Sequence, residues 1–115
     1  PEYLINDNIA DRKGIESPNG VASGFNKAIK QGCSVVVLDL DMHPDKFKQL
    51  PSIKLASAIN NRHFDFENGI ISECYIIYNG KAVKITTDFF SCDKRQTKER
   101  IRTELEKIKG DRSPL

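Results

Sequence analysis

The alternation of hydrophobic and polar residues divides the chain into short strands and amphipathic helices. Two β-type runs, over 3–5 and 9–13, flank Asn-Asp-Asn, residues that tolerate the backbone of a hairpin turn. Over 21–31 the apolar residues recur at helical spacing, and Gly32 follows as a residue that can end a helix. The segment "CSVVVLDL" is continuous and β-branched, which predicts a strand covered on both faces.

The second half of the chain shows the same two patterns. "SIKLASAINNR" predicts an amphipathic helix, and "HFDFENG" predicts a turn-rich loop. "ECYIIYNGKAVKIT" predicts a hairpin, because Asn-Gly between two β-rich runs is the type I′ signal. "TTDFFSCD" predicts irregular structure or a strand end, after which Asp93 can cap a last helix over 94–109.

The element order is therefore β-β-α-β-α-β-β-α. We expect an α+β fold, with a mostly antiparallel twisted sheet of about five strands and helices packed mainly on one face. A length of 115 residues fits a single nuclease-like domain over 1–115. Within it we expect an α/β core over 1–93, a C-terminal basic helix over 94–110 and a frayed tail over 111–115.

Charge alone does not identify a partner, because the net charge is only +2. The segment 94–109 nevertheless holds seven Lys and Arg residues against three Glu. We interpret it as a solvated helix with Glu–Lys pairs, and a stripe that faces RNA or a protein partner is the alternative. No apolar run approaches the roughly 18 residues that a membrane span requires, so we expect no membrane span in this domain. No basic targeting leader precedes the first strand, and we expect a domain of a larger protein.

The cysteines and acids give no metal-binding pattern. Cys33, Cys74 and Cys92 lie far apart without a CxxC motif, which favours reduced thiols, with a Cys33–Cys74 bridge as the alternative. Asp39 and Asp41 end a strand, as in phosphatases of the haloacid dehalogenase type, but that family needs a larger sheet than 115 residues supply. We interpret the two acids as a solvated strand end and expect no metal and no cofactor.

Three adjacent charges, Asp11, Arg12 and Lys13, close the second predicted strand, where a strand pair should be half buried. We take them to indicate phosphodiester chemistry. RNA carries its own nucleophile, the 2′-hydroxyl, so a ribonuclease needs only a base, a cation for the phosphorane and a proton donor. Asp11 and Lys13 share a face of the strand, which favours Lys13 as that cation. A surface ion pair between the two is the alternative.

The neighbouring segments supply further polar groups. The general base is left open among Asp11, Glu16 and His63, where His63 would have to face the first hairpin. The candidate catalytic residues are thus Asp11, Lys13, Glu16 and His63. The candidate RNA-binding residues are Arg12, Ser17, Asn19, Asn26, Lys27 and Lys30.

Two other functions fit parts of this pattern. Pro1-Glu2 followed by Asp11-Arg12-Lys13 is similar to the P-(D/E)…(D/E)-x-K motif of metal-dependent restriction-type nucleases, in which the acids bind a divalent metal. The other is not enzymatic: an interaction domain of a phage or mobile element that binds a protein through its edge strands or basic helix.

The stretches "PEYLIN…ADRKG", "NGVASGFNKAIKQGCSVVVLDL" and "YIIYNGKAVKI" resemble the C-terminal tRNase domains of contact-dependent growth inhibition and related polymorphic toxins, of the barnase/EndoU/colicin/RelE superfamily. The resemblance covers about residues 1–86. By position, Asp11 and Lys13 match the family's acid-x-basic element, and Ser17, Asn19 and Asn26 match its cleft-lining polar positions. Glu2 replaces the family's aspartate, and Asn8 stands where glycine is commoner, which leaves the catalytic set open.

The resemblance implies an activity and a setting. It implies metal-independent cleavage of tRNA that leaves a cyclic phosphate, and a cognate immunity protein that plugs the cleft. It also implies secretion as part of a larger effector that is delivered to the cytoplasm of a target cell.

Overall fold

The computed structural model describes residues 3–5, 8–14, 19–40, 51–78, 80–91 and 93–109, and of 3–5, 8–14, 19 and 109 it describes the backbone alone. The strands are β1 (Tyr3–Ile5), β2 (Asn8–Gly14), β3 (Val35–Asp39), β4 (Glu73–Tyr78) and β5 (Lys81–Thr86). The helices are α1 (Asn19–Lys30), α3 (Ser52–Asn60), α4 (His63–Glu67) and α5 (Lys94–Lys109), with a 3-10 turn η1 (Thr87–Phe90).

The sheet is mixed, and the expectation of a mostly antiparallel sheet is wrong. Its strand order is β1-β2-β3-β4-β5. The strands with described side chains, β3, β4 and β5, form a three-stranded mixed sheet, because β3 pairs parallel with β4 while β4 pairs antiparallel with β5. On the other side β3 pairs parallel with β2. Helices connect β2 to β3 and β3 to β4, and such crossovers return the chain to the edge where it began, which makes neighbouring strands parallel.

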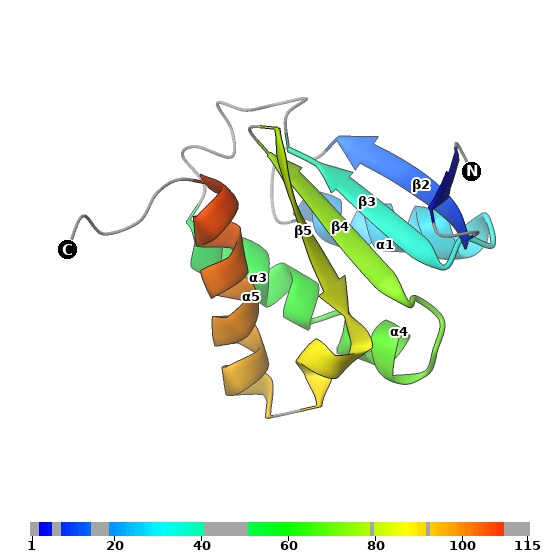
Figure 1. Cartoon of the computed structure of the whole chain (residues 1–115). Helices are drawn as coiled ribbons and strands as arrows, with labels where there is room; N and C mark the ends of the chain where they lie inside the picture. The colour runs from blue at the N-terminus through cyan, green and yellow to red at the C-terminus, as the bar shows by residue number, and fades with distance from the viewer. Residues whose placement is uncertain are drawn as a thin grey trace.

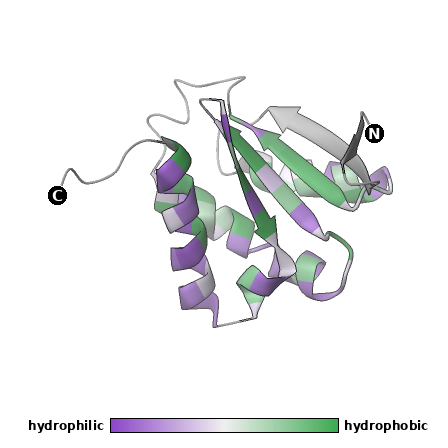
Figure 2. Cartoon of the chain, in the orientation of Figure 1, coloured by the Kyte–Doolittle hydropathy of each residue, from purple (hydrophilic) through white to green (hydrophobic). Residues whose placement is uncertain are grey.

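The helices lie against one face of this sheet (Figure 1). Val36 and Leu38 of β3, Ile76 of β4 and Ile85 of β5 belong to the main hydrophobic cluster, which also takes the buried residues of the helices. Val35 and Val37 face the other way and pack with Tyr75 and Ile77 in a second, smaller cluster that contains no described helix residue. We call this second surface the helix-free face. Figure 2 shows the same division, with green strands and helix faces turned inward and a largely purple outer surface on α5.

Several local predictions are confirmed. Gly32 ends α1 with a φ of 79°, and the Cys33 amide donates to the Ala28 carbonyl at 2.8 Å. Tyr78 pairs with Lys81 across a two-residue turn whose Gly80 has a φ of 72°. The left-handed backbone that such a turn requires has a low steric cost only in glycine or asparagine.

The N-terminus of α5 is also as predicted. Asp93 Oδ1 accepts a hydrogen bond from the Gln96 amide at 2.8 Å, so Asp93 caps the helix. A second hydrogen bond connects this end of α5 with α3, where Asn60 Nδ2 donates to the Lys94 carbonyl at 3.0 Å.

Two segments predicted to be irregular are helical, which also changes the element order. The loop expected over 63–69 begins with α4, because Phe66 is anchored in the core with its ring stacked on that of Phe90 at 4.4 Å. Residues 87–90 form η1, whose Phe89 carbonyl accepts a hydrogen bond from the Thr97 hydroxyl of α5 at 2.8 Å. Contacts between distant segments therefore outweigh the turn-forming composition of both stretches.

Two predictions concern buried polar groups. Cys33 and Cys74 are buried thiols, as expected, and the alternative bridge between them is not formed. Asp39 is fully buried, so the interpretation of this acid as part of a solvated strand end is wrong. Asp41, Cys92 and the tail over 111–115 lie outside the described residues.

Candidate functional site on the helix-free face

Three polar side chains meet on the helix-free face of β4 and β5. Glu73 Oε2 lies 3.1 Å from Lys84 Nζ, and the Tyr75 hydroxyl donates to Glu73 Oε1 at 3.3 Å. Glu73 is thus held between a cation and a phenol. We call these three residues the Glu73–Tyr75–Lys84 cluster.

The strand period places these groups on one face. Glu73 and Tyr75 alternate with buried Cys74 and Ile76 along β4, and Lys84 alternates with buried Val83 and Ile85 along β5. Tyr75 is opposite Lys84 in the antiparallel register, and Glu73 is opposite Thr86. Glu73 reaches Lys84 diagonally, a separation that long side chains span across a strand pair.

The register extends the row from β2 to β5. Tyr75 pairs with Val37 of β3, and Val37 pairs with position 12 of β2, which is Arg12. The residues in register from β2 to β5 are therefore Arg12, Val37, Tyr75 and Lys84.

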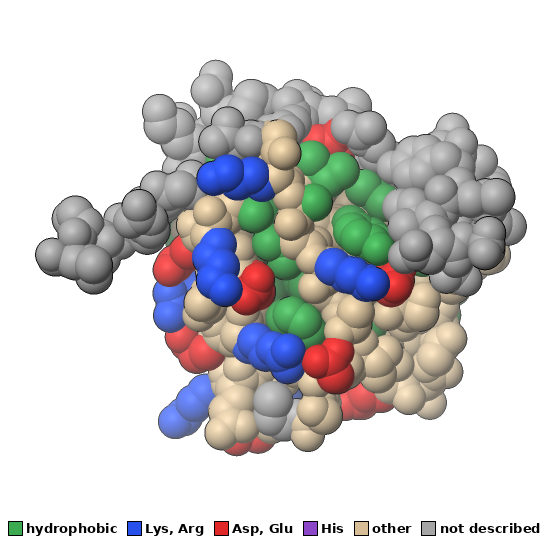
Figure 3. Space-filling view, in the orientation of Figure 1, with side chains coloured by type: hydrophobic (Ala, Val, Ile, Leu, Met, Phe, Trp, Pro, Cys, Tyr) green, Lys and Arg blue, Asp and Glu red, His purple; other side chains and the backbone are tan. Residues whose placement is uncertain are grey.

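The cluster lies at the boundary between apolar and aqueous surroundings. The Glu73 side chain is only 16% exposed, whereas that of Lys84 is 46% exposed. The hydrogen bond and charge of Glu73 raise the pKa of the Lys84 ammonium above its ordinary value, so Lys84 is protonated at neutral pH. Figure 3, in the orientation of Figure 1, shows hydrophobic surface between basic and acidic side chains. A charged group beside apolar surface interacts more strongly than it would in bulk water.

The backbone register also locates the predicted residues Asp11 and Lys13. Asp11 pairs with Val36 and Lys13 with Leu38, the β3 positions of the helix-covered face. Their side chains lie outside what the structure describes, as does that of Asn19, and Glu16 and Ser17 lie outside the described residues altogether. The assignment of these five residues stays a prediction.

His63 is not at the exit of β2. It begins α4, and its Nδ1 lies 3.1 Å from Glu67 Oε1 on the same helix. The chain then leads to the start of β4, where the Ser72 amide donates to the Ser34 carbonyl beside the start of β3. β2 ends at the other end of these parallel strands, where Gly14 is in register with Asp39, the last residue of β3 (Figure 1). The structure therefore does not bring His63 together with Lys13.

The predicted RNA-binding residues of α1 lie on the helix layer. The Asn26 carbonyl oxygen accepts a hydrogen bond from Arg62 Nη2 at 2.8 Å, while Lys27 and Lys30 are exposed in the last turn. Arg62 also forms an ion pair with Asp65 at 2.7 Å and lies over the Phe25 ring, 5.4 Å from its centroid. Asn26 thus belongs to a fixed polar network between α1 and the segment after α3.

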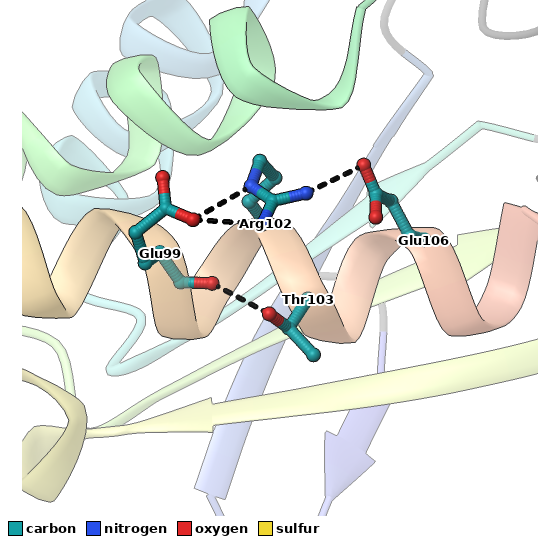
Figure 4. Close-up of polar contacts among 4 residues, drawn as sticks. All are labelled: Glu99, Arg102, Thr103 and Glu106. Atoms are coloured by element: carbon teal, nitrogen blue, oxygen red, sulfur yellow. Dashed lines mark hydrogen bonds and ion pairs between the residues drawn. The ribbon is translucent and has the colours of Figure 1, made fainter. Parts of the chain in front are cut away.

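Three basic residues of the helix α5, Arg100, Arg102 and Lys107, form ion pairs with acids. Figure 4 shows Arg102 between Glu99 and Glu106, at 2.7 Å and 2.8 Å, and the Thr103 hydroxyl donating to the Glu99 carbonyl at 2.9 Å. Hydrogen bonds from Arg102 lower the pKa of Glu99. Lys107 lies 3.0 Å from Glu104. The Lys107–Glu104 pair agrees with the interpretation of a solvated helix with Glu–Lys pairs, and Arg102 adds pairs of a second kind.

Neither a metal cluster nor a membrane span is found within the described ranges. No three His, Cys, Asp or Glu side chains among those residues gather as ligands would. None of the described helices is both long and apolar enough to cross a bilayer.

The Glu73–Tyr75–Lys84 cluster is absent from the candidate residues that the sequence indicates. One signal for it exists, since polar residues alternate with apolar ones in both strands of the predicted hairpin, so that one face of it carries polar groups. The pairing of Glu73 with Lys84 depends on the strand register, which the Asn-Gly turn fixes. Comparison with protein-family models, with curated proteins and with solved structures found no match to this chain.

Proposed function

We propose that this chain is a metal-independent ribonuclease of the toxin type, which cleaves RNA at its helix-free face. The supporting observation is the Glu73–Tyr75–Lys84 cluster, which combines a carboxylate, a hydroxyl donor and a cation within hydrogen-bonding distance. These are the three kinds of group that cleavage by the ribose 2′-hydroxyl requires.

Glu73 has the role of general base. It takes the proton of the 2′-hydroxyl, and the 2′-oxygen then forms a bond to phosphorus, which gives a pentacovalent phosphorane. Lys84, a protonated lysine at neutral pH, stabilises the negative charge of that species.

Tyr75 has the role of proton donor. The bond from phosphorus to the 5′-oxygen breaks, and the 5′-oxygen takes the phenolic proton of Tyr75. Tyr75 recovers a proton from Glu73 along their 3.3 Å hydrogen bond. The products are a 2′,3′-cyclic phosphate and a 5′-hydroxyl, and one proton has moved from the 2′-oxygen to the 5′-oxygen.

The substrate and setting are part of the same proposal. Together with the toxin-like pattern of residues 1–86, the site suggests tRNA as the substrate and a cognate immunity protein as the partner that blocks the site. Secretion within a larger effector and delivery to the cytoplasm of a target cell complete this proposal.

The direct test is cleavage of total RNA by the purified chain with and without EDTA. We expect tRNA fragments that end in a 2′,3′-cyclic phosphate, in equal yield with and without the chelator. Loss of cleavage with EDTA would favour the metal-dependent nuclease instead. Intact RNA, together with harmless expression in cells that have no antidote, would favour the interaction domain.

The same assay tests the predicted role of Lys13. The sequence pattern predicts that Lys13→Ala abolishes cleavage and toxicity with an unchanged fold, whereas a reaction centred on Glu73 and Lys84 predicts cleavage at the wild-type rate, because position 13 is in register with Leu38 of the helix-covered face. If this variant still kills cells and still cuts tRNA, Lys13 has no role in the reaction. Lys107→Ala, on the outer surface of α5, is the matched control.

A further inference from the structure

A groove of about 470 Å³ lies on the helix layer, between α1 and α3. Its polar lining comes from α3 and the residues that follow it: Lys54, Ser57, Asn61 and Arg62. A volume of this size is in the range of small-molecule and nucleotide sites in proteins. No acid is among its lining residues. The lining therefore offers cations, an amide and a hydroxyl to a ligand, and the carboxylate of Asp65, which is bonded to Arg62, does not line the groove.

Part of the groove lining is apolar. Ala22 of α1 and Ala58 of α3 contribute methyl groups to it, and Ile53, which also lines the groove, is 37% exposed. Small side chains let a ligand approach the helices closely. An exposed isoleucine next to them provides an apolar contact for a ribose or a base.

Arg62 is held in place at one end of the groove. Its Nε and Nη2 bond to Asp65, and Nη2 also bonds to Asn26, so the guanidinium plane is fixed before any ligand arrives. Nη1 takes part in none of these bonds, and its two hydrogens remain as donors. Asp65 balances the charge of Arg62, whereas Lys54 has no acid beside it in the groove.

The line of polar groups continues along α1. Ala22, which lines the groove, and Asn26, which bonds to Arg62, are followed by Lys30 at the same spacing of four residues. Residues at this spacing share one face of a helix. Lys54 lies in the first turn of α3, and Arg62 lies beyond the end of that helix, directly before α4. Lys54, Arg62 and Lys30 therefore form a track of donors.

We propose that this track is an exosite for the phosphate backbone of RNA, on the helix layer and thus apart from the Glu73–Tyr75–Lys84 cluster. The inference rests on the proposed ribonuclease function and extends it to a second RNA-contacting surface. The substrate is then a structured RNA long enough to reach two faces of the domain. Recognition is by phosphate charge, so it is independent of base sequence.

The test measures binding of a fully 2′-O-methylated RNA hairpin, which lacks the nucleophile and so cannot be cut whatever residues catalyse the reaction. Affinity is measured by fluorescence anisotropy at several salt concentrations, for the wild-type chain and for Lys54→Glu and Lys30→Glu. Each variant should bind about tenfold more weakly and reduce the slope of log affinity against log salt by about one. The matched control is Lys107→Glu, which makes the same change of charge on α5.

Weakened binding in the two groove variants, with the control unaffected, supports the exosite. Wild-type affinity in Lys54→Glu and Lys30→Glu overturns it, and so does equal weakening in all three variants, which is a general charge effect. Absence of binding by the wild-type chain also overturns it. Failure of the exosite is distinct from failure of the proposed function, because RNA cleavage is scored separately on unmodified RNA.

Discussion

At the scale of single residues, the site depends on which face of a strand each side chain occupies. The sequence indicates Asp11 and Lys13 by their proximity along the chain, whereas the structure brings together Glu73, Tyr75 and Lys84 from two strands. Proximity in sequence is visible without coordinates. Contact between side chains of β4 and β5 depends on the register of the two strands, because a slip by one residue would turn each side chain of a strand to the other face of the sheet.

The ion pair between Glu73 and Lys84 predicts a specific titration. The folded-state pKa of Lys84 is raised, so the stabilising effect of the pair is fully present below the ordinary lysine pKa and is lost as pH rises through the folded value. NMR of the Lys84 side chain should give a midpoint above that of an unpaired lysine. The midpoint should fall in Glu73→Gln. An identical midpoint in both proteins would mean that the pair is not formed in solution.

Burial likewise predicts the reactivity of Cys74. This thiol is inaccessible in the core, and burial raises its pKa, so little thiolate forms at pH 8. Alkylation with iodoacetamide followed by peptide mass spectrometry should leave Cys74 unmodified in the native chain. Full modification should follow denaturation in guanidinium chloride. Rapid labelling of Cys74 in the native chain would contradict the fold at β4.

At the scale of elements, strong local signals predict well and composition predicts poorly. The Asn-Gly turn, Gly32 and the Asp93 cap each act within a few residues, so the sequence contains the whole cause. α4 and η1 depend instead on Phe66 and Phe90, whose stacking joins segments more than 20 residues apart. The sequence around residues 63–69 does not include Phe90, so a prediction from neighbouring residues alone cannot take this contact into account.

The two sides of α5 predict very different effects of mutation. Leu105 is fully buried between α5 and the rest of the core, whereas Arg102 is bound on the surface by two glutamates. Leu105→Ala should lower the free energy of unfolding by about 2–5 kcal/mol, because it leaves a cavity. Arg102→Ala should lower it by less than about 1 kcal/mol. Urea unfolding followed by circular dichroism measures both, and equal effects would contradict the packing of α5.

At the scale of the whole molecule, strand direction is the feature that the local hydrophobic pattern does not determine. The order of elements contains β2-α1-β3 and β3-α3-α4-β4, and helical crossovers of this kind give parallel neighbours. The two hairpins, β1–β2 and β4–β5, are antiparallel, and extending their pattern to all strands leads to the wrong prediction of a mostly antiparallel sheet. The consequence is functional, because the crossovers place the helices on one face and leave Glu73, Tyr75 and Lys84 on the other.

Most of the core could be predicted from the sequence, since hydrophobic periodicity identifies α1, β3 and the β4–β5 hairpin. The candidate site could not, because a site on a sheet face is assembled from different strands. Arg12 illustrates the difficulty. It is adjacent to Asp11 and Lys13 in sequence, but the register places it in the row of Tyr75 and Lys84.

The central claim is that Glu73 is the base in RNA cleavage on the helix-free face. The most direct measurement is the single-turnover rate of tRNA cleavage by Glu73→Gln, which keeps the size of the side chain and removes its basicity. If Glu73 is the base, the rate should be lower by about 100-fold or more, with an unchanged melting temperature. A rate within twofold of the wild-type chain, in a protein that does cut tRNA, would contradict it.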